Sequence, residues 1–273
     1  HLIQYDKKEN NKLILFLPGT SGKPKKSLFL KTALNLGYRV IYLSVISTPG
    51  ISTTCINENL FLDENCAEKF RLKRIYGHNI SNLITDLPKD AIYTRFKDLL
   101  VYLKTNKPKD GWEKYLIQNK INWSNIVVAG QSQGGGMACM IAKNHNVGGV
   151  ISFSGAIKDV AWIDENDVPV FAAHDYQDPV VPYERGLSVL DFGSLQVPLM
   201  YISGGKSIID ALKEKNVYSE LVTVETAEHV SYLTGTSVDS HWNLICTKSA
   251  AFIEDIICTT TWSVDEHSVS FNV

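Results

Sequence analysis

The sequence lacks the features of a membrane protein and of a nucleic-acid-binding protein. No apolar run approaches the roughly 20 residues that a membrane helix needs, and the longest clean runs, Leu13–Leu17 and Ile126–Ala129, have the length of strands. The formal net charge of the 273 residues is only −2, and lysine and arginine are scattered along the chain. A basic surface for nucleic acid would need these residues to cluster. We therefore expect no integral membrane segment and no nucleic-acid partner.

Sequence motifs for cofactors and metals are also missing. The chain has no Gly-x-Gly-x-x-Gly after a strand, no Gly-x-x-x-x-Gly-Lys-Ser/Thr phosphate loop and no His-Glu-x-x-His. These patterns place backbone amides or histidines around phosphates and zinc. No cofactor and no metal site are therefore expected.

Cysteine is scarce, and the five residues are too few and odd in number for a framework of disulfides in a chain of this length. Cys139 falls in a predicted helix, and Cys246 and Cys258 fall in the last one, so these three are expected to be buried as small apolar side chains. Cys55 and Cys66 lie instead in a polar stretch and are spaced to close a short loop. A disulfide and two free thiols both remain open at this point.

Apolar runs of strand length alternate with helical patterns along most of the chain, which is typical of a mostly parallel sheet flanked by helices. We expect a single α/β domain over residues 1–273, with its core at about 13–257, a long loop at 46–72 and a tail at 259–273. The expected strands are Leu13–Leu17, Tyr38–Val45, Ile126–Ala129, Val147–Ser154, Val168–Ala173 and Leu221–Glu225. The expected helices are Ser27–Leu36, Ala91–Lys104, Trp112–Ile121, Gln133–Asn144 and one from His241 or Trp242 to about Ile257.

The most informative motif is Gly130-Gln131-Ser132-Gln133-Gly134, which follows an apolar strand and opens a helix. This order of strand, Gly-x-Ser-x-Gly and helix predicts a nucleophile elbow. The glycines are needed because the strand and the helix pack too closely for side chains at these positions. The start of the helix also directs unpaired amides to the place where negative charge develops. We therefore predict that Ser132 is a nucleophile.

A serine nucleophile needs a histidine base and a carboxylate that orients the base. After an elbow of this kind the acid comes first along the chain and the histidine second. The strand Val168–Ala173 leads into His174-Asp175-Tyr176-Gln177-Asp178, with Val-Pro shortly after. This pattern favours Asp178 as the acid. Asp175 is the alternative, and its structural interpretation is a turn residue at the strand exit.

Two histidines lie where the base is expected. His229 follows the last expected strand by a few residues, and His241 stands at the start of the last helix. Either position suits a loop above the carboxyl ends of the strands, and the pattern leaves the choice open.

The oxyanion of acyl transfer needs amide donors. The backbone N–H of Gln133, the residue after the nucleophile, is one predicted donor. The other is expected in the loop Leu17-Pro18-Gly19-Thr20-Ser21-Gly22, where we choose Thr20 first and Ser21 next.

These motifs resemble a poorly characterised, often exported bacterial branch of the α/β-hydrolase superfamily. Beyond the elbow and the acid, the similarity includes Leu-Pro-Gly-Thr at 17–20, Trp-Ser-Asn at 123–125 and His-Trp-Asn-Leu-Ile at 241–245. The resemblance implies an α/β-hydrolase fold and a triad of Ser132, Asp178 and His241, with His229 as second choice.

The same resemblance implies a Cys55–Cys66 disulfide and an exported protein, periplasmic or secreted. Gln131 departs from the family, in which histidine is common before the nucleophile. Since position 131 is not a triad member, this difference changes the polarity of the pocket more than the mechanism.

The sequence therefore predicts hydrolysis of a small-molecule or lipid carboxylic ester through an acyl-serine intermediate. One alternative keeps the triad and changes the substrate to an amide or a lipid. The alternative from another class is a non-catalytic binding module with the same fold.

Overall fold

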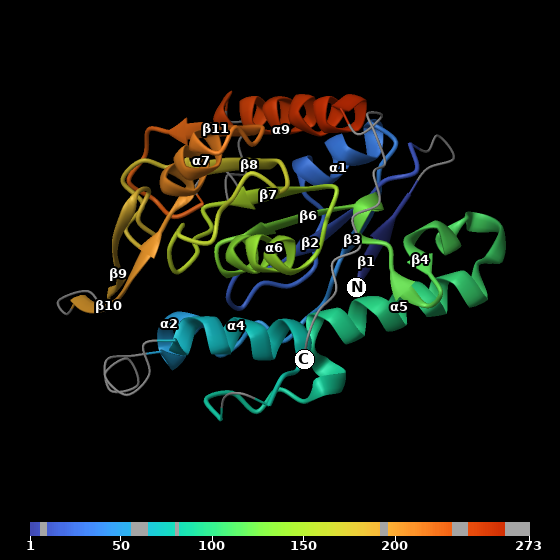
Figure 1. Cartoon of the computed structure of the whole chain (residues 1–273), viewed down its shortest axis with the longest axis horizontal. Helices are drawn as coiled ribbons and strands as arrows, with labels where there is room; N and C mark the ends of the chain where they lie inside the picture. Colours follow the sequence, from blue (N-terminus) through green and yellow to red (C-terminus); the bar gives the residue numbers. More distant parts are fainter. Residues whose placement is uncertain (6–9, 56–64, 80–81, 192–195, 231–239, 260–273) are drawn as a thin grey trace.

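A seven-stranded sheet with helices on both faces forms the body of the protein, as the alternation of strands and helices predicts (Figure 1). The computed structural model describes residues 1–5, 10–55, 65–79, 82–191, 196–230 and 240–259. The strand order is β1-β3-β2-β6-β7-β8-β11, and every neighbouring pair is parallel except β1 with β3. The strands are β1 (Leu2–Gln4), β2 (Leu13–Leu17), β3 (Arg39–Tyr42), β6 (Ile126–Gln131), β7 (Gly149–Phe153), β8 (Val170–Asp175) and β11 (Ser219–Val224).

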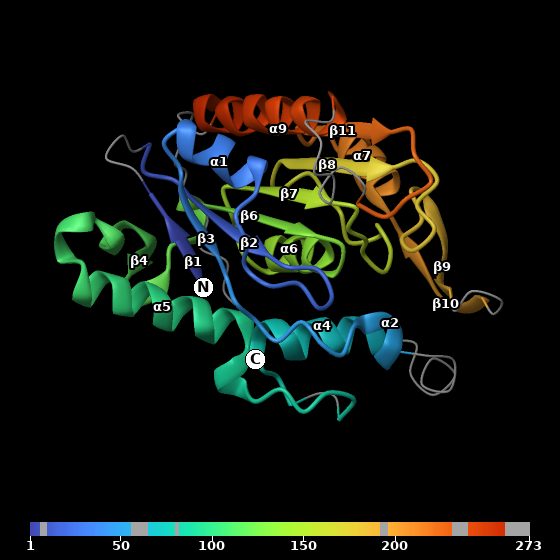
Figure 2. The same ribbon diagram turned by 180° about the vertical axis from the view of Figure 1, so that it is seen from behind.

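Two groups of helices cover the two faces of the sheet (Figures 1 and 2). One face carries α1 (Leu28–Asn35) and α9 (Ser240–Thr259), and the other carries α4 (Cys66–Tyr76), α5 (Ile92–Asn106), α6 (Gln133–Asn144) and α7 (Gly205–Glu214). None of the helices in the described ranges is long and apolar enough to cross a membrane.

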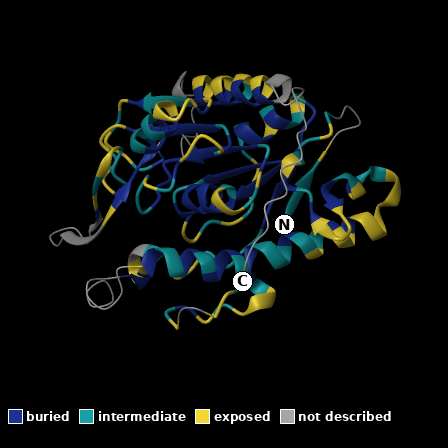
Figure 3. Ribbon diagram, viewed as in Figure 1, coloured by how far each residue is buried: buried dark blue, intermediate teal, exposed yellow. Residues whose placement is uncertain are grey.

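The sheet is the most deeply buried layer (Figure 3). In β2, Leu13, Leu15 and Leu17 pack with the core on the α6 side, whereas Ile14 and Phe16 pack with the core on the α1 side. A parallel strand covered on both faces has no solvent side, and this is why β2 reads as an uninterrupted apolar run.

Segment 46–72, which we expected to be a long loop, contains helical structure. Both α2 (Ile51–Thr54) and the first part of α4 lie within it. The pattern of α4 is unclear in the sequence because this helix buries Arg71, Lys73 and Arg74 together with Phe70. The expected tail at 259–273 lies outside the described residues except for Thr259, where α9 ends.

The expected helix Trp112–Ile121 is wrong. The segment forms a 3₁₀ turn, η3 (Trp112–Tyr115), and a hairpin of β4 (Leu116–Ile117) and β5 (Lys120–Ile121). Gln118 and Asn119 in the hairpin have φ of 49° and 63°, values that suit a tight hairpin turn and end a helix.

Helix α7 and a second antiparallel pair, β9 (Arg185–Asp191) with β10 (Gln196–Ser203), were not expected from the sequence. The remaining short 3₁₀ turns are η1 (Pro88–Asp90), η2 (Pro108–Asp110) and η4 (Trp123–Asn125).

Candidate active site

Ser132 lies on a sharp turn between β6 and α6, at the carboxyl end of the central strand. Its backbone has φ 51° and ψ −122°, a conformation that costs a residue with a side chain about 1–3 kcal/mol. The backbone N–H of Ser132 donates to the Phe153 carbonyl at the end of β7, over 2.7 Å. The turn predicted from the motif is therefore present, and it holds the serine at the edge where the parallel strands end.

Close backbone contacts explain the glycines around Ser132. A Cβ on Gly130 would lie 2.3 Å from the Gly134 carbonyl oxygen, and a Cβ on Gly134 would lie 2.4 Å from the Leu17 carbonyl oxygen. Further along α6, a Cβ on Gly136 would lie 2.4 Å from the carbonyl oxygen of Ala156. Because each contact is with main chain, no rotation of a neighbouring side chain relieves it. The glycines thus allow α6 to begin directly against β2 and β6.

Asp178 lies in the loop after β8, where both of its carboxylate oxygens have partners. Oδ1 accepts the backbone N–H groups of Val180 and Val181 over 2.8 and 2.9 Å. Oδ2 lies 2.6 Å from Nδ1 of His229, and the Asp178 side chain is fully buried. The two amides thus fix the carboxylate and leave Oδ2 directed at the imidazole.

Asp178 remains ionised in this buried place. Burial alone would raise the pKa of its carboxyl, but hydrogen bonds from His174, His229 and the Val181 amide together lower the pKa to about 2. The Gly205 N–H donates to Nδ1 of His174 over 3.1 Å, so Nε2 carries the proton. His174 Nε2 lies 3.0 Å from the Val181 carbonyl oxygen and 3.5 Å from Asp178 Oδ2. The N–H of the buried His174 therefore lies close to the Asp178 carboxylate.

His229 occupies the position between the acid and the serine. Its Nδ1 lies 2.6 Å from Asp178 Oδ2, and its Nε2 lies 2.9 Å from Ser132 Oγ. Because the ionised carboxylate only accepts hydrogen bonds, Nδ1 carries the proton and Nε2 is free to accept from the serine hydroxyl. The histidine found at this position is thus His229, our second choice, and not His241, our first. His241 falls in the first turn of α9, and its side chain lies outside the described residues.

Hydrogen bonds to the loop after β8 hold the segment that carries His229. The Thr226 hydroxyl donates to Asp175 Oδ1, and the Thr226 carbonyl accepts the Gln177 N–H over 3.0 Å. Asp175, the alternative acid, is therefore engaged in anchoring this segment. Val230, directly after His229, has φ 51°, which is rare for a β-branched residue. The contacts around this segment thus fix the backbone conformation next to His229.

The loop after β2 lies against the elbow, where the predicted oxyanion donors are needed. A Cβ on Gly19 would lie 3.3 Å from Ser132 Cβ, and the Thr20 hydroxyl donates to Gln133 Oε1 over 3.4 Å. Gln133 is the first residue of α6, so its backbone N–H has no acceptor within the helix. The structure thus brings Thr20 and Gln133 together beside the nucleophile.

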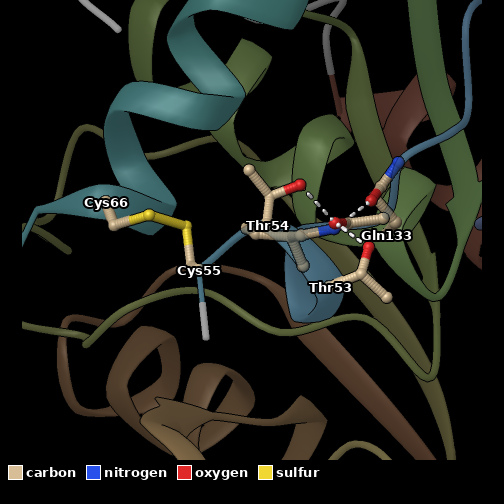
Figure 4. Close-up of a disulfide and its surroundings, with 7 residues drawn as sticks. Thr53, Thr54, Cys55, Cys66 and Gln133 are labelled. Atoms are coloured by element: carbon tan, nitrogen blue, oxygen red, sulfur yellow. Dashed lines mark hydrogen bonds between the residues drawn. A yellow bond between two sulfur atoms is a disulfide. The ribbon is translucent and has the colours of Figure 1, made fainter. Parts of the chain in front are cut away.

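The side chain of Gln133 connects the elbow to α2 and to a disulfide (Figure 4). Its Oε1 accepts the Ile51 N–H over 2.9 Å at the start of α2. This helix ends before Cys55, which is bonded to Cys66, the first residue of α4. Both cysteines are buried. The disulfide therefore joins α4 to the short helix that contacts the elbow.

A cavity of about 260 Å³ opens at Ser132. Ile51, Val180, Ile202 and Val230 form its apolar walls. The polar side chains that line it are those of Thr20, Arg71, Gln131, Ser132, Gln133, Ser188 and His229. Of these, the motifs did not single out Ser188 on β9 or Arg71 on α4 for the site. In the described parts of the chain, no Asp or Glu lines the cavity and no group of side chains is placed to hold a metal ion.

The buried Asp178 makes folding stability depend on acidity. Its pKa is about 2 in the folded protein, against an ordinary value of 3.8, so its contribution is complete above about pH 4 and is lost as the pH falls towards 2. The difference corresponds to about 2 kcal/mol. We expect wild type to lose this amount between about pH 5 and pH 2 beyond what Asp178→Asn loses, as measured by urea unfolding. Equal losses in the two proteins would contradict the expectation.

Part of the chain matches a known family. Residues 110–192, which include Ser132 and Asp178, match the family model described as phospholipase/carboxylesterase. Searched against curated proteins, the chain has no match.

Solved esterases share the fold at low sequence identity. Esterase 2 of Thermogutta terrifontis phosphorylated by paraoxon is 13% identical with a TM-score of 0.52, over 92% of this chain and 85% of that one. The same esterase with propionate bound is 13% identical with a TM-score of 0.51, over 92% and 86% of the two chains. A sugar hydrolase, YeeB, from Lactococcus lactis is 14% identical with a TM-score of 0.52, over 94% of both chains. Taken together, residues 110–192 are similar to phospholipases and carboxylesterases, and the chain shares the fold of these solved hydrolases.

Proposed function

We propose that the protein hydrolyses carboxylic esters through an acyl-serine intermediate, with Ser132, His229 and Asp178 as its triad. The observation that carries this proposal is the chain of two hydrogen bonds, 2.6 Å from Asp178 to His229 and 2.9 Å from His229 to Ser132. Both distances lie within the range that proton transfer from a nucleophile to its base requires.

The reaction follows from the positions of these groups. Ser132 Oγ attacks the ester carbonyl carbon while His229 Nε2 takes the hydroxyl proton, and Asp178 stabilises the imidazolium. The backbone N–H groups of Gln133 and Thr20 are the proposed donors to the oxyanion of the tetrahedral intermediate. Collapse breaks the bond to the alcohol, which leaves with the proton from His229. Water then repeats the same steps on the acyl-serine and releases the acid.

The size of the cavity favours a short acyl chain. Its volume of about 260 Å³ is below the usual range of ligand pockets, roughly 300–1,000 Å³, and its apolar walls suit a few methylene groups. The disulfide between Cys55 and Cys66 supports export to an oxidising compartment, where such bonds persist.

The test combines covalent labelling with turnover. A fluorophosphonate probe is expected to label wild type at Ser132, located by mass spectrometry, and to leave Ser132→Ala unlabelled. Turnover of p-nitrophenyl esters from acetate to decanoate is expected to peak among the short chains. A protein that neither reacts with the probe nor cleaves any ester is a binding module with this fold, and the proposal fails.

A further inference from the structure

Arg71 is a buried cation in the wall of the active-site cavity. It lies on α4 and is only 5% exposed. Its Nη2 donates to the Ala156 carbonyl over 3.2 Å, whereas Nε and Nη1 are buried and have no hydrogen-bond partner among the described groups. Two donor nitrogens are therefore unsatisfied in the guanidinium of a residue that lines the cavity.

No carboxylate of the described residues forms an ion pair with Arg71. Burial lowers the pKa of its guanidinium to about 10, so the group still carries its charge at neutral pH. The charge of Glu68 on the same helix acts on Arg71 without forming an ion pair, and a buried charge that has no ion pair is among the most costly arrangements in a protein. A cost of this kind indicates that a bound ligand supplies the negative charge that pairs with Arg71.

Arg74, one turn further along the same helix, shows the contrast. Its Nε lies 2.8 Å from Asp86 Oδ2, and its Nη1 donates to the Pro49 carbonyl over 2.8 Å. Arg74 thus has a carboxylate and a carbonyl as partners within the fold. Arg71, at the cavity, has no carboxylate partner among the described residues.

The cavity itself is suited to an anion. Arg71 and Ser132 line the same cavity of about 260 Å³, and no acidic residue is among the described residues around it. A Cβ on Gly136 would lie 3.5 Å from Arg71 Nε, so α6 packs directly against the guanidinium at this glycine.

We propose that Arg71 binds a carboxylate of the substrate, so that the preferred substrates are small esters with a free carboxylate, such as the half-esters of dicarboxylic acids. This inference rests on the proposed ester hydrolysis at Ser132. An arginine side chain is the usual partner of a carboxylate in a water-poor site, because its planar donors match the carboxylate oxygens.

The experiment compares matched esters that differ only in the anionic group. On the acyl side, p-nitrophenyl hemiglutarate is paired with p-nitrophenyl valerate, which has the same number of carbons. On the alcohol side, 4-acetoxybenzoate is paired with its methyl ester. Spontaneous hydrolysis is subtracted with Ser132→Ala. In at least one pair, kcat/KM of wild type is expected to favour the anionic ester by about 10-fold or more, the size of one charge-assisted hydrogen bond.

The variants separate binding from a structural role. In Arg71→Met the preference is expected to disappear, and in Arg71→Lys part of it is retained. Lys143→Met, which removes a cation of α6 outside the cavity lining, keeps the preference and serves as the matched control. The Tm of Arg71→Met should not fall, because the variant loses an unpaired buried charge. If Arg71→Met has a lower Tm and loses kcat/KM equally on both esters of a pair, Arg71 has a structural role and the inference is overturned.

Binding without turnover distinguishes the two proposals. Monomethyl glutarate is expected to raise the Tm of Ser132→Ala and to leave that of the Ser132→Ala/Arg71→Met double variant unchanged. If wild type cleaves p-nitrophenyl valerate and methyl 4-acetoxybenzoate with the same kcat/KM as their anionic partners, the proposed carboxylate site is wrong and the proposed esterase activity stands. If monomethyl glutarate binds through Arg71 but no ester is cleaved, the esterase is wrong and the anion site stands.

Discussion

Replacement of His229 with alanine is expected to lower kcat on p-nitrophenyl acetate by about 10⁴-fold or more. The variant loses the only described group that bonds Ser132 Oγ on one side and Asp178 on the other. Without it, the serine hydroxyl has no acceptor for its proton, and a neutral hydroxyl is a poor nucleophile. The measurement is single-turnover kinetics, so that slow acyl-serine hydrolysis does not hide the loss of acylation.

His241→Ala is the matched control for this prediction. Both changes remove one imidazole from the part of the chain that follows β11, and we expect kcat of His241→Ala to stay within about tenfold of wild type. A large loss in His241→Ala with a small loss in His229→Ala would assign the base to α9 and contradict the hydrogen-bond geometry.

Asp178→Asn is expected to lower kcat by about 10³–10⁴-fold with little change in KM. The amide of asparagine can donate to His229 Nδ1, which the carboxylate cannot do. An imidazole that accepts at Nδ1 carries its proton on Nε2, so it no longer accepts the proton of Ser132. The wrong tautomer, more than the lost charge, is then the cause. Kinetics and the imidazole ¹⁵N shifts of the variant test this explanation together.

Asp175→Asn is the neighbouring control, since it also removes a buried carboxylate, at the end of β8 and three residues before Asp178. Its oxygens accept from Thr226 and Ser154, so the change is expected to reduce stability more than kcat. Equal kcat losses in the two variants would show that general disturbance of the loop, and not the orientation of His229, limits catalysis.

The sharp turn at Ser132 and the position of Asp178 beside it were predictable because their signals are local. The steric demand at Gly130 and Gly134 comes from the turn itself, and it appears in the sequence as Gly-x-Ser-x-Gly between a strand and a helix. Asp178 likewise follows its strand directly and is fixed by amides two and three residues further on. Short-range geometry of this kind leaves a pattern that one sequence can show.

The histidine beside Ser132 was not predictable in the same way. His229 and His241 both follow the last strand, and local pattern does not separate them. What places His229 is a set of contacts across the fold, among them the bond from Thr226 to Asp175, 51 residues apart in sequence. The family resemblance gave a preference for His241 that the geometry does not support.

Helix α4 was missed for a related reason. Its interior side includes Arg71 and Arg74, and a helix that buries cations has no clean apolar period. The signal that remained in the sequence was the excess of cationic over acidic residues within α4. Only the packing shows that Arg74 is paired with Asp86 and that Arg71 lines the cavity.

The glycines at 130, 134 and 136 decide which parts of this protein an engineer can change. Each is in contact with the main chain of another segment, so no second substitution elsewhere can make room for a side chain there. Directed evolution of substrate range should therefore leave the turn unaltered. Val180, Ile202 and Val230 line the cavity, and libraries of apolar residues at these positions can resize the acyl pocket without touching the glycines.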